Sequence, residues 1–143
     1  MSDLRVRVAS DVRNPIVVSA NQYRGLTRLD IRHNFTDEGG ELRPTKKGVS
    51  IPIADAQALV MALETAVAPA DNTKTVAEVG ADVREPLFVS VEPYKGKMRL
   101  DVRHYFGDRG ELRPGIKGVN VPWQDRDALL AAVREVIGEL VAA

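Results

Sequence analysis

The stretch DVRNPIVVS at residues 11–19 returns as DVREPLFVS at residues 82–90. Farther along, RLDIRH at 28–33 returns as RLDVRH at 99–104. The offset is about 71 residues and falls by one after the glycine pair at 39–40, and roughly half of the aligned positions are identical. Self-similarity of this kind predicts a tandem duplication of one small module.

The length of the chain decides how the two modules must behave. The 143 residues, 15.6 kDa in all, are enough for one ordinary domain or two very small ones. Each module alone is near the lower limit for an independent core, so we expect the two to pack on one another. We place the first repeat at 1–67, a linker with a lead-in strand at 68–81, and the second repeat at 82–143.

Composition excludes several classes of protein. The chain has 20 Lys+Arg, 20 Asp+Glu and no cysteine, so it is not a polycation and has no disulfide, thiolate metal site or cysteine nucleophile. No apolar run approaches the roughly 20 residues that span a bilayer, and the start lacks a signal-peptide pattern. We therefore expect no membrane association and a location in the cytoplasm, with the nucleoid if bacterial, or in the nucleus if eukaryotic.

Each repeat is predicted to contain four strands followed by one helix. Pro15 and Pro86 precede short β-branched or aromatic runs, as is typical of strand starts, and a further strand is expected at 4–8. In the segment 27–32, apolar and charged residues alternate, which predicts a strand with one core face and one charged face. Short connections between the strands predict antiparallel sheets, and the fold class is therefore α+β.

The helices are expected to follow Asp55 and Asp125, which we interpret as N-caps. Both helices carry an apolar stripe at helical spacing, which is typical of core packing. The stripes consist of Ala58, Leu59, Ala62, Leu63, Ala66 and Val67 in the first, and Leu129, Val133, Val136, Ile137 and Leu140 in the second.

Catalysis, metal binding and cofactor binding have little support. The only two histidines, His33 and His104, are repeat mates with core-facing parity, which favours a structural role at a strand end. A zinc site needs about four ligands, and no glycine pattern has the strand–turn–helix context of a phosphate loop. Asp37 and Glu41 lack the spacing of a calcium loop and are interpreted as solvated turn residues. We expect no enzyme, metal or cofactor.

Basic and aromatic residues favour the strands and loops, whereas the helices and the linker are more acidic. A neutral chain with this placement can present a basic sheet face, and cations beside aromatics are what single-strand binding requires. The cations on the two sheets include Arg28 and Arg99. An alternating Arg/Asp strand is equally consistent with a solvated face of cross-strand pairs. Phe35 and Phe106 follow core parity unless the chain bends, which leaves burial and stacking both open.

The residues SVEPYKGK at 90–97, LDVRHYF at 100–106 and GELRPGIKGV at 110–119 resemble the positive cofactor four family of transcriptional coactivators, which bind single-stranded DNA. The first repeat resembles it through YRG at 23–25 and ELRPTKKG at 41–48. The resemblance implies a strongly curved four-stranded antiparallel sheet with a C-terminal helix. It also implies that the two repeats replace the family's dimer as an intramolecular pseudo-dimer.

The resemblance also implies roles for individual residues. Tyr23 and Tyr94 would stack on bases, and Phe35 and Phe106 would take the place of a family tryptophan. The implied phosphate contacts and groove-lining cations are Arg24, Lys95, Lys97, Arg32, Arg103, Arg43, Arg113, Lys46, Lys47 and Lys117.

The two repeats depart from the family pattern at different positions. The first has Leu26 where the second has Lys97, and the second has Ile116 where the first has Lys46. Each copy therefore lacks one cation that the other keeps, which predicts two unequal grooves or one composite path.

The functional hypothesis is single-stranded nucleic-acid binding with little sequence specificity, serving transcription regulation or DNA maintenance. DNA is the expected ligand, RNA is an alternative, and transcription or replication machinery are candidate partners. The alternative function is a protein-interaction scaffold that keeps the fold without the DNA groove. The expected state is a monomeric pseudo-dimer, with further self-association left open.

Overall fold

The computed structural model describes residues 5–8, 15–67, 74–79, 85–107 and 111–142. The first residues of the repeated stretch, 11–14 and 82–84, the linker residues 68–73 and the loop at 108–110 lie outside these residues. The first repeat contains β1 (Arg5–Val8), β2 (Ile16–Tyr23), β3 (Leu26–Thr36), β4 (Leu42–Pro52), the 3-10 turn η1 (Ile53–Asp55) and α1 (Ala56–Val67). β5 (Lys74–Val79) lies in the segment 68–81, where a lead-in strand was expected. The second repeat contains β6 (Leu87–Tyr94), β7 (Lys97–Phe106), β8 (Arg113–Pro122), η2 (Trp123–Asp125) and α2 (Arg126–Ala142), and β5 is counted with it from here on because it completes the same sheet.

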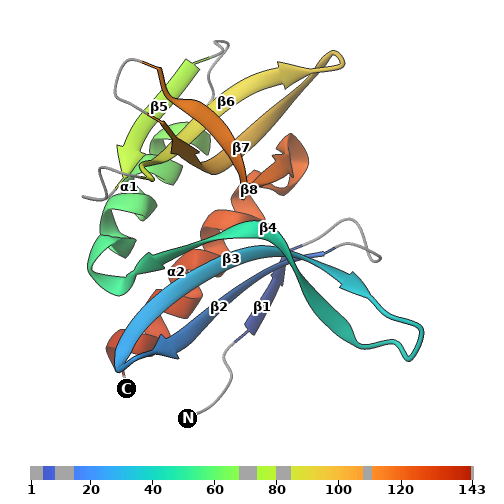
Figure 1. Ribbon diagram of the computed structural model, residues 1–143, viewed down its shortest axis with the longest axis vertical. Coiled ribbons are helices and arrows are strands. Elements are labelled where there is room, and N and C mark those ends of the chain that lie inside the picture. Colours follow the sequence, from blue (N-terminus) through green and yellow to red (C-terminus); the bar gives the residue numbers. More distant parts are fainter. Residues whose placement is uncertain (1–4, 9–14, 68–73, 80–84, 108–110, 143) are drawn as a thin grey trace.

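The predicted α+β architecture is confirmed. Each repeat forms a four-stranded sheet in which neighbouring strands are consecutive in sequence, β1-β2-β3-β4 and β5-β6-β7-β8, and every pairing is antiparallel (Figure 1). The central hairpins turn on two residues with positive φ, Arg24 with Gly25 and Lys95 with Gly96. Two positive φ values in succession are the geometry that matches the twist of a tight hairpin.

A break in register bends the third strand of each sheet. Arg32 pairs with Gly48, but Asn34 pairs with Pro44, so His33 lies at an irregularity between the two strands. The second repeat has the same break between Arg103 and Tyr105. Such irregularities increase the bend and the twist of a strand and change which face the following side chains occupy.

The register break explains why the two phenylalanines for which burial and stacking were both left open, Phe35 and Phe106, are exposed. Phe35 is 43% exposed and Phe106 is 49% exposed, so neither ring is buried in the core. Both lie beyond the break, near the far end of a long hairpin, where strict alternation along the strand no longer applies.

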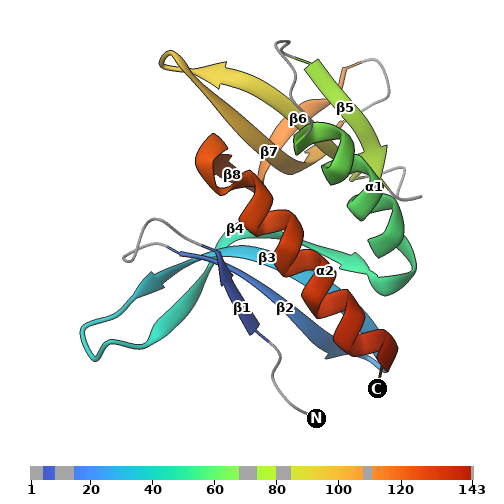
Figure 2. The same ribbon diagram turned by 180° about the vertical axis from the view of Figure 1, so that it is seen from behind.

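The helices are exchanged between the repeats. Helix α2 packs against β1 and β2 of the first repeat, and α1 packs against β5 and β6 of the second (Figures 1 and 2). The helices also contact one another, and β4 contacts β8 where the two sheets meet. Buried side chains of both repeats form a single apolar cluster that includes Leu29, Leu59, Leu100 and Leu129.

The helices α1 and α2 begin directly after Asp55 and Asp125, where the sequence predicted their starts. Asp55 and Asp125 are themselves the last residues of the 3-10 turns η1 and η2, so helical structure begins three residues earlier than predicted, after Pro52 and Pro122. Pro52 and Pro122 precede these turns and make no side-chain cap hydrogen bond. A tight 3-10 turn at the start of a helix is common, and sequence pattern alone does not distinguish it from a capped α-helical turn.

The exchanged helices predict that the chain unfolds as one cooperative unit. Leu129→Ala removes a fully buried side chain of α2 and should lower the free energy of unfolding by about 2–5 kcal/mol. Urea unfolding, followed by far-ultraviolet circular dichroism and by the fluorescence of Trp123, should give coincident transitions in wild type and variant. Two separate transitions would contradict the shared core. The exposed Glu135→Ala on the same helix is the control, expected within about 0.5 kcal/mol of wild type.

Candidate nucleic-acid interface

A cleft of about 900 Å³ lies between the two repeats. Its floor is the charged face of the first sheet, and its opposite wall comes from the second repeat. We call it the inter-repeat cleft. The floor includes Asn21, Gln22, Arg28, Asp30, Arg32, Lys46, Gly48 and Ser50, and the wall includes Glu85, Leu87, His104, Ile116 and Lys117.

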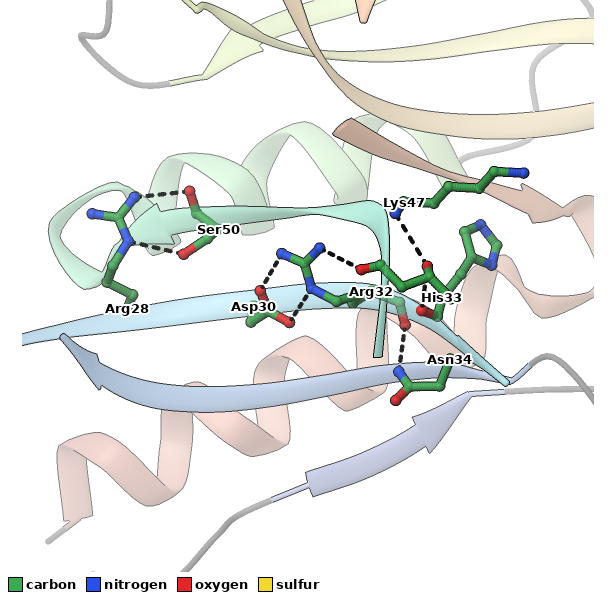
Figure 3. Close-up of polar contacts among 8 residues, drawn as sticks. Arg28, Asp30, Arg32, His33, Asn34, Lys47 and Ser50 are labelled. Atoms are coloured by element: carbon green, nitrogen blue, oxygen red, sulfur yellow. Dashed lines mark hydrogen bonds and ion pairs between the residues drawn. The ribbon is translucent and has the colours of Figure 1, made fainter. Parts of the chain in front are cut away.

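Arg32 is fixed on the floor of the cleft by three hydrogen bonds (Figure 3). Its Nε and Nη2 donate to the two carboxylate oxygens of Asp30 at 3.2 and 2.9 Å, and its Nη1 donates to the Thr45 carbonyl at 2.9 Å. The side chain lies across Gly48, where an added β-carbon would be 2.7 Å from Arg32 Cγ. A glycine at this position therefore makes the path of the arginine possible.

The second repeat has the same arrangement. Arg103 donates to Asp101 and, through Nη1, to the Gly115 carbonyl at 2.8 Å. It lies across Gly118, whose added β-carbon would be 2.7 Å from Arg103 Cγ. Arg32 and Arg103 thus lie on the sheet face, where they were predicted. Each guanidinium is bound to a carboxylate of its own strand.

The two other sheet-face arginines contact the neighbouring strand. Arg28 donates from Nε to Ser50 Oγ at 2.8 Å and from Nη2 to the Ser50 carbonyl at 2.9 Å (Figure 3). Arg99 makes the equivalent bonds to the side-chain oxygen and the carbonyl of Asn120. Ser50 and Asn120 were not among the predicted site residues. They are repeat mates that lie opposite Asp30 and Asp101 in the strand register, so the arginines reach them diagonally, which the sequence pattern did not indicate.

His33 connects the two repeats. Its Nε2 accepts a hydrogen bond from the backbone N–H of Asn120 at 3.3 Å. Burial lowers the pKa of His33, and the nearby charges of Lys47, Arg103 and Arg99 lower it further, against an opposing effect of Asp101. Its repeat mate His104 instead donates from Nδ1 to the carbonyl of Glu85 in its own repeat, at 3.0 Å.

The remaining predicted cations are exposed, and some form ion pairs. Lys117 lies 3.5 Å from a carboxylate oxygen of Glu85. Arg43 lies 2.8 Å from Asp37 and 3.3 Å from Glu41, and it holds the pKa of the Asp37 carboxyl below its usual range. The other exposed cations of the predicted set are Arg24, Lys46, Lys47, Lys95, Lys97 and Arg113.

The cleft therefore brings together only part of the predicted set. Arg28, Arg32 and Lys46 of the first repeat face Lys117 of the second, whereas Arg43 lies on the long β3–β4 hairpin. The side chains of Tyr23 and Tyr94 lie outside the described part of the structure, so their predicted stacking stays a prediction.

The described residues include no group of three or more His, Asp or Glu placed to hold a metal ion. Among the same residues, no helix is both long and apolar enough to cross a membrane.

A comparison with protein families gives two matches on this chain. The family described as Transcriptional Coactivator p15 (PC4) matches residues 11–62 and again residues 83–132. The two matches cover most of the chain, and each lies within one of the two repeats. Each includes a central hairpin, the following strand and the start of a helix.

The position of His33 predicts a pH dependence of stability. Because the folded state lowers its pKa below 6.5, the unfolded state takes up a proton first. The stability contributed by neutral His33 should be complete above about pH 6.5 and be lost as the pH falls below it. Urea midpoints at pH 8 and pH 5.5 should therefore differ less in His33→Gln than in wild type. An equal difference in both proteins would contradict this, and His104→Gln serves as the matched control.

Proposed function

Because the chain belongs to the Transcriptional Coactivator p15 (PC4) family, we propose that it binds single-stranded DNA in the inter-repeat cleft and on the equivalent face of the second repeat. The family is one of non-enzymatic, DNA-binding coactivators. The observation that supports the proposal most directly is the cleft itself, whose cations come from both repeats.

The fixed arginines suit the recognition of phosphate. A guanidinium has five N–H donors, and Arg32 uses three in the contacts to Asp30 and Thr45. The remaining donors are held in one orientation, which reduces the entropy that would be lost when a phosphate binds. Arg103 has the same contacts in the second repeat, so both sheets offer an oriented donor group.

The geometry favours unpaired over paired strands. The exposed rings of Phe35 and Phe106 can contact the faces of bases only where these are not stacked in a duplex. Stacking and phosphate contacts are available to every nucleotide, so little sequence preference is expected. RNA offers the same groups, and DNA is favoured here by the family alone.

The process served is proposed from the family. A coactivator family supports a role in transcription regulation, with the transcription machinery as partner, and DNA maintenance is the second process that generic single-strand binding would serve. We further propose that the protein is located with the nucleoid in a bacterium or in the nucleus in a eukaryote.

A protein-interaction scaffold is the second candidate function. Leu26 and Ile116 are 63% and 62% exposed, at positions where the other repeat has Lys97 and Lys46. Ile116 lines the inter-repeat cleft together with the acidic Asp55 and Glu85, and an exposed apolar side chain in these surroundings would suit a protein partner better than a phosphate chain.

Binding to a fluorescent oligo-dT of about 20 nucleotides tests the first function, since this length exceeds the site sizes of comparable small folds. We expect affinity to fall with salt, with each phosphate contact adding about −0.7 to the slope of log K against log salt. Duplex DNA of the same length should compete poorly. No binding at low salt would contradict the proposal and favour the scaffold.

The two hairpin turns should contribute unequally. Lys97→Leu gives the second repeat the residue of the first, and should weaken oligo-dT binding and reduce the salt slope by about 0.7, the value of one phosphate contact. Leu26→Lys is the opposite exchange and should strengthen binding by a similar factor.

Arg134→Gln, on helix α2, is the charge control and should leave the affinity unchanged. Equal affinities of wild type, Lys97→Leu and Leu26→Lys would show that neither turn contacts the strand.

A further inference from the structure

Building on the proposed single-strand binding, we propose that the second repeat holds an unpaired base on the aromatic pair Phe88–Tyr105, whereas the first repeat contacts the strand without such a base site. The two ring centroids are 5.0 Å apart and the ring planes are inclined at 76°. Rings at this angle form an edge-to-face pair, so one ring supports the other and a ring face stays available.

The pair lies on the charged face of the second sheet. Phe88 of β6 is directly opposite Arg103 of β7 in the strand register. Tyr105 follows the register break in β7 and meets Phe88 on this face. A ring next to a fixed guanidinium combines a surface for stacking a base with a donor for the adjoining phosphate.

The first repeat does not have this feature. The positions equivalent to Phe88 and Tyr105 are Val17 and Asn34, which are only 7% and 8% exposed. Asn34 uses its side-chain amide to donate to the Arg32 carbonyl at 3.1 Å (Figure 3). Phe88 and Tyr105 of the second repeat both remain partly exposed. The surface formed by these two positions is therefore accessible to a ligand in the second repeat and buried in the first.

The Tyr105 hydroxyl adds a hydrogen-bond donor to the site. Burial raises the pKa of this phenol, and the carboxylates of Asp101 and Glu92 raise it further, against the opposing charge of Arg103. The hydroxyl therefore remains protonated across the physiological range and can donate to a base carbonyl or a phosphate oxygen. A strand bound across both repeats would have this additional base contact, at Phe88–Tyr105, on the second sheet only, whereas the contacts of Phe35 and Phe106 are common to both repeats.

The test compares oligo-dT with an abasic oligonucleotide of the same length, a deoxyribose-phosphate chain without bases. Wild type should prefer oligo-dT. The double variant Phe88→Val/Tyr105→Asn, which installs the residues of the first repeat, should lose roughly tenfold in oligo-dT affinity and keep its affinity for the abasic chain. Unchanged abasic binding also shows that the variant is folded. Tyr105→Phe keeps the ring, and should keep most of the preference.

Crosslinking of unmodified protein provides a second measurement that does not depend on variants. An oligonucleotide carrying 5-iodouracil should crosslink at Phe88 or Tyr105, as mapped by mass spectrometry. Crosslinks confined to the first repeat would overturn the inference. So would a double variant that retains the full preference for oligo-dT over the abasic chain, and both results would leave single-strand binding intact. Absence of wild-type binding to either oligonucleotide removes the proposed function, and this site with it.

Discussion

The exchange of helices between the repeats is the constraint on which the rest of the structure depends. Each four-stranded sheet has one apolar face, and a sheet with an uncovered apolar face is not stable in water. Because α2 covers β1 and β2 while α1 covers β5 and β6, neither sheet completes its core without the other repeat. The same exchange fixes the orientation of the two charged faces. The inter-repeat cleft, with a floor from one repeat and a wall from the other, is therefore a consequence of how the core is completed.

The second common feature of the repeats is an arginine laid over a glycine. Asp30 and Asp101 are buried carboxylates, and such groups need a partner because an isolated buried charge is strongly destabilising. Arg32 and Arg103 provide the partner, and Gly48 and Gly118 leave the space for their stems. The same guanidinium thus forms a structural ion pair and is a potential phosphate contact. The alternation of charges along the strand is consistent with either role and does not distinguish them.

Much of the fold could be predicted from the internal repeat and from the alternation of apolar and charged residues along the strands, but three features could not. Helical periodicity predicts an apolar stripe on α2 and cannot say which sheet receives it, because either sheet offers the same kind of surface. The register break at His33 is a property of the pairing with β4, so the exposure of Phe35 could not be read from β3 alone. The Phe88–Tyr105 contact joins two strands, and Phe88 by itself has the pattern of an ordinary strand residue.

Joining the two repeats in one chain has a consequence for their divergence. Two modules made as separate polypeptides would assort into three dimers, two of them symmetric and one mixed. A substitution such as Lys97 opposite Leu26 would then appear twice, once or not at all in a given molecule. A covalent connection between the exchanged partners yields the mixed species alone, at any protein concentration. Each repeat can therefore accumulate substitutions that would be harmful if both subunits of a dimer had them. Every molecule then contains one copy of each of the two diverged repeats.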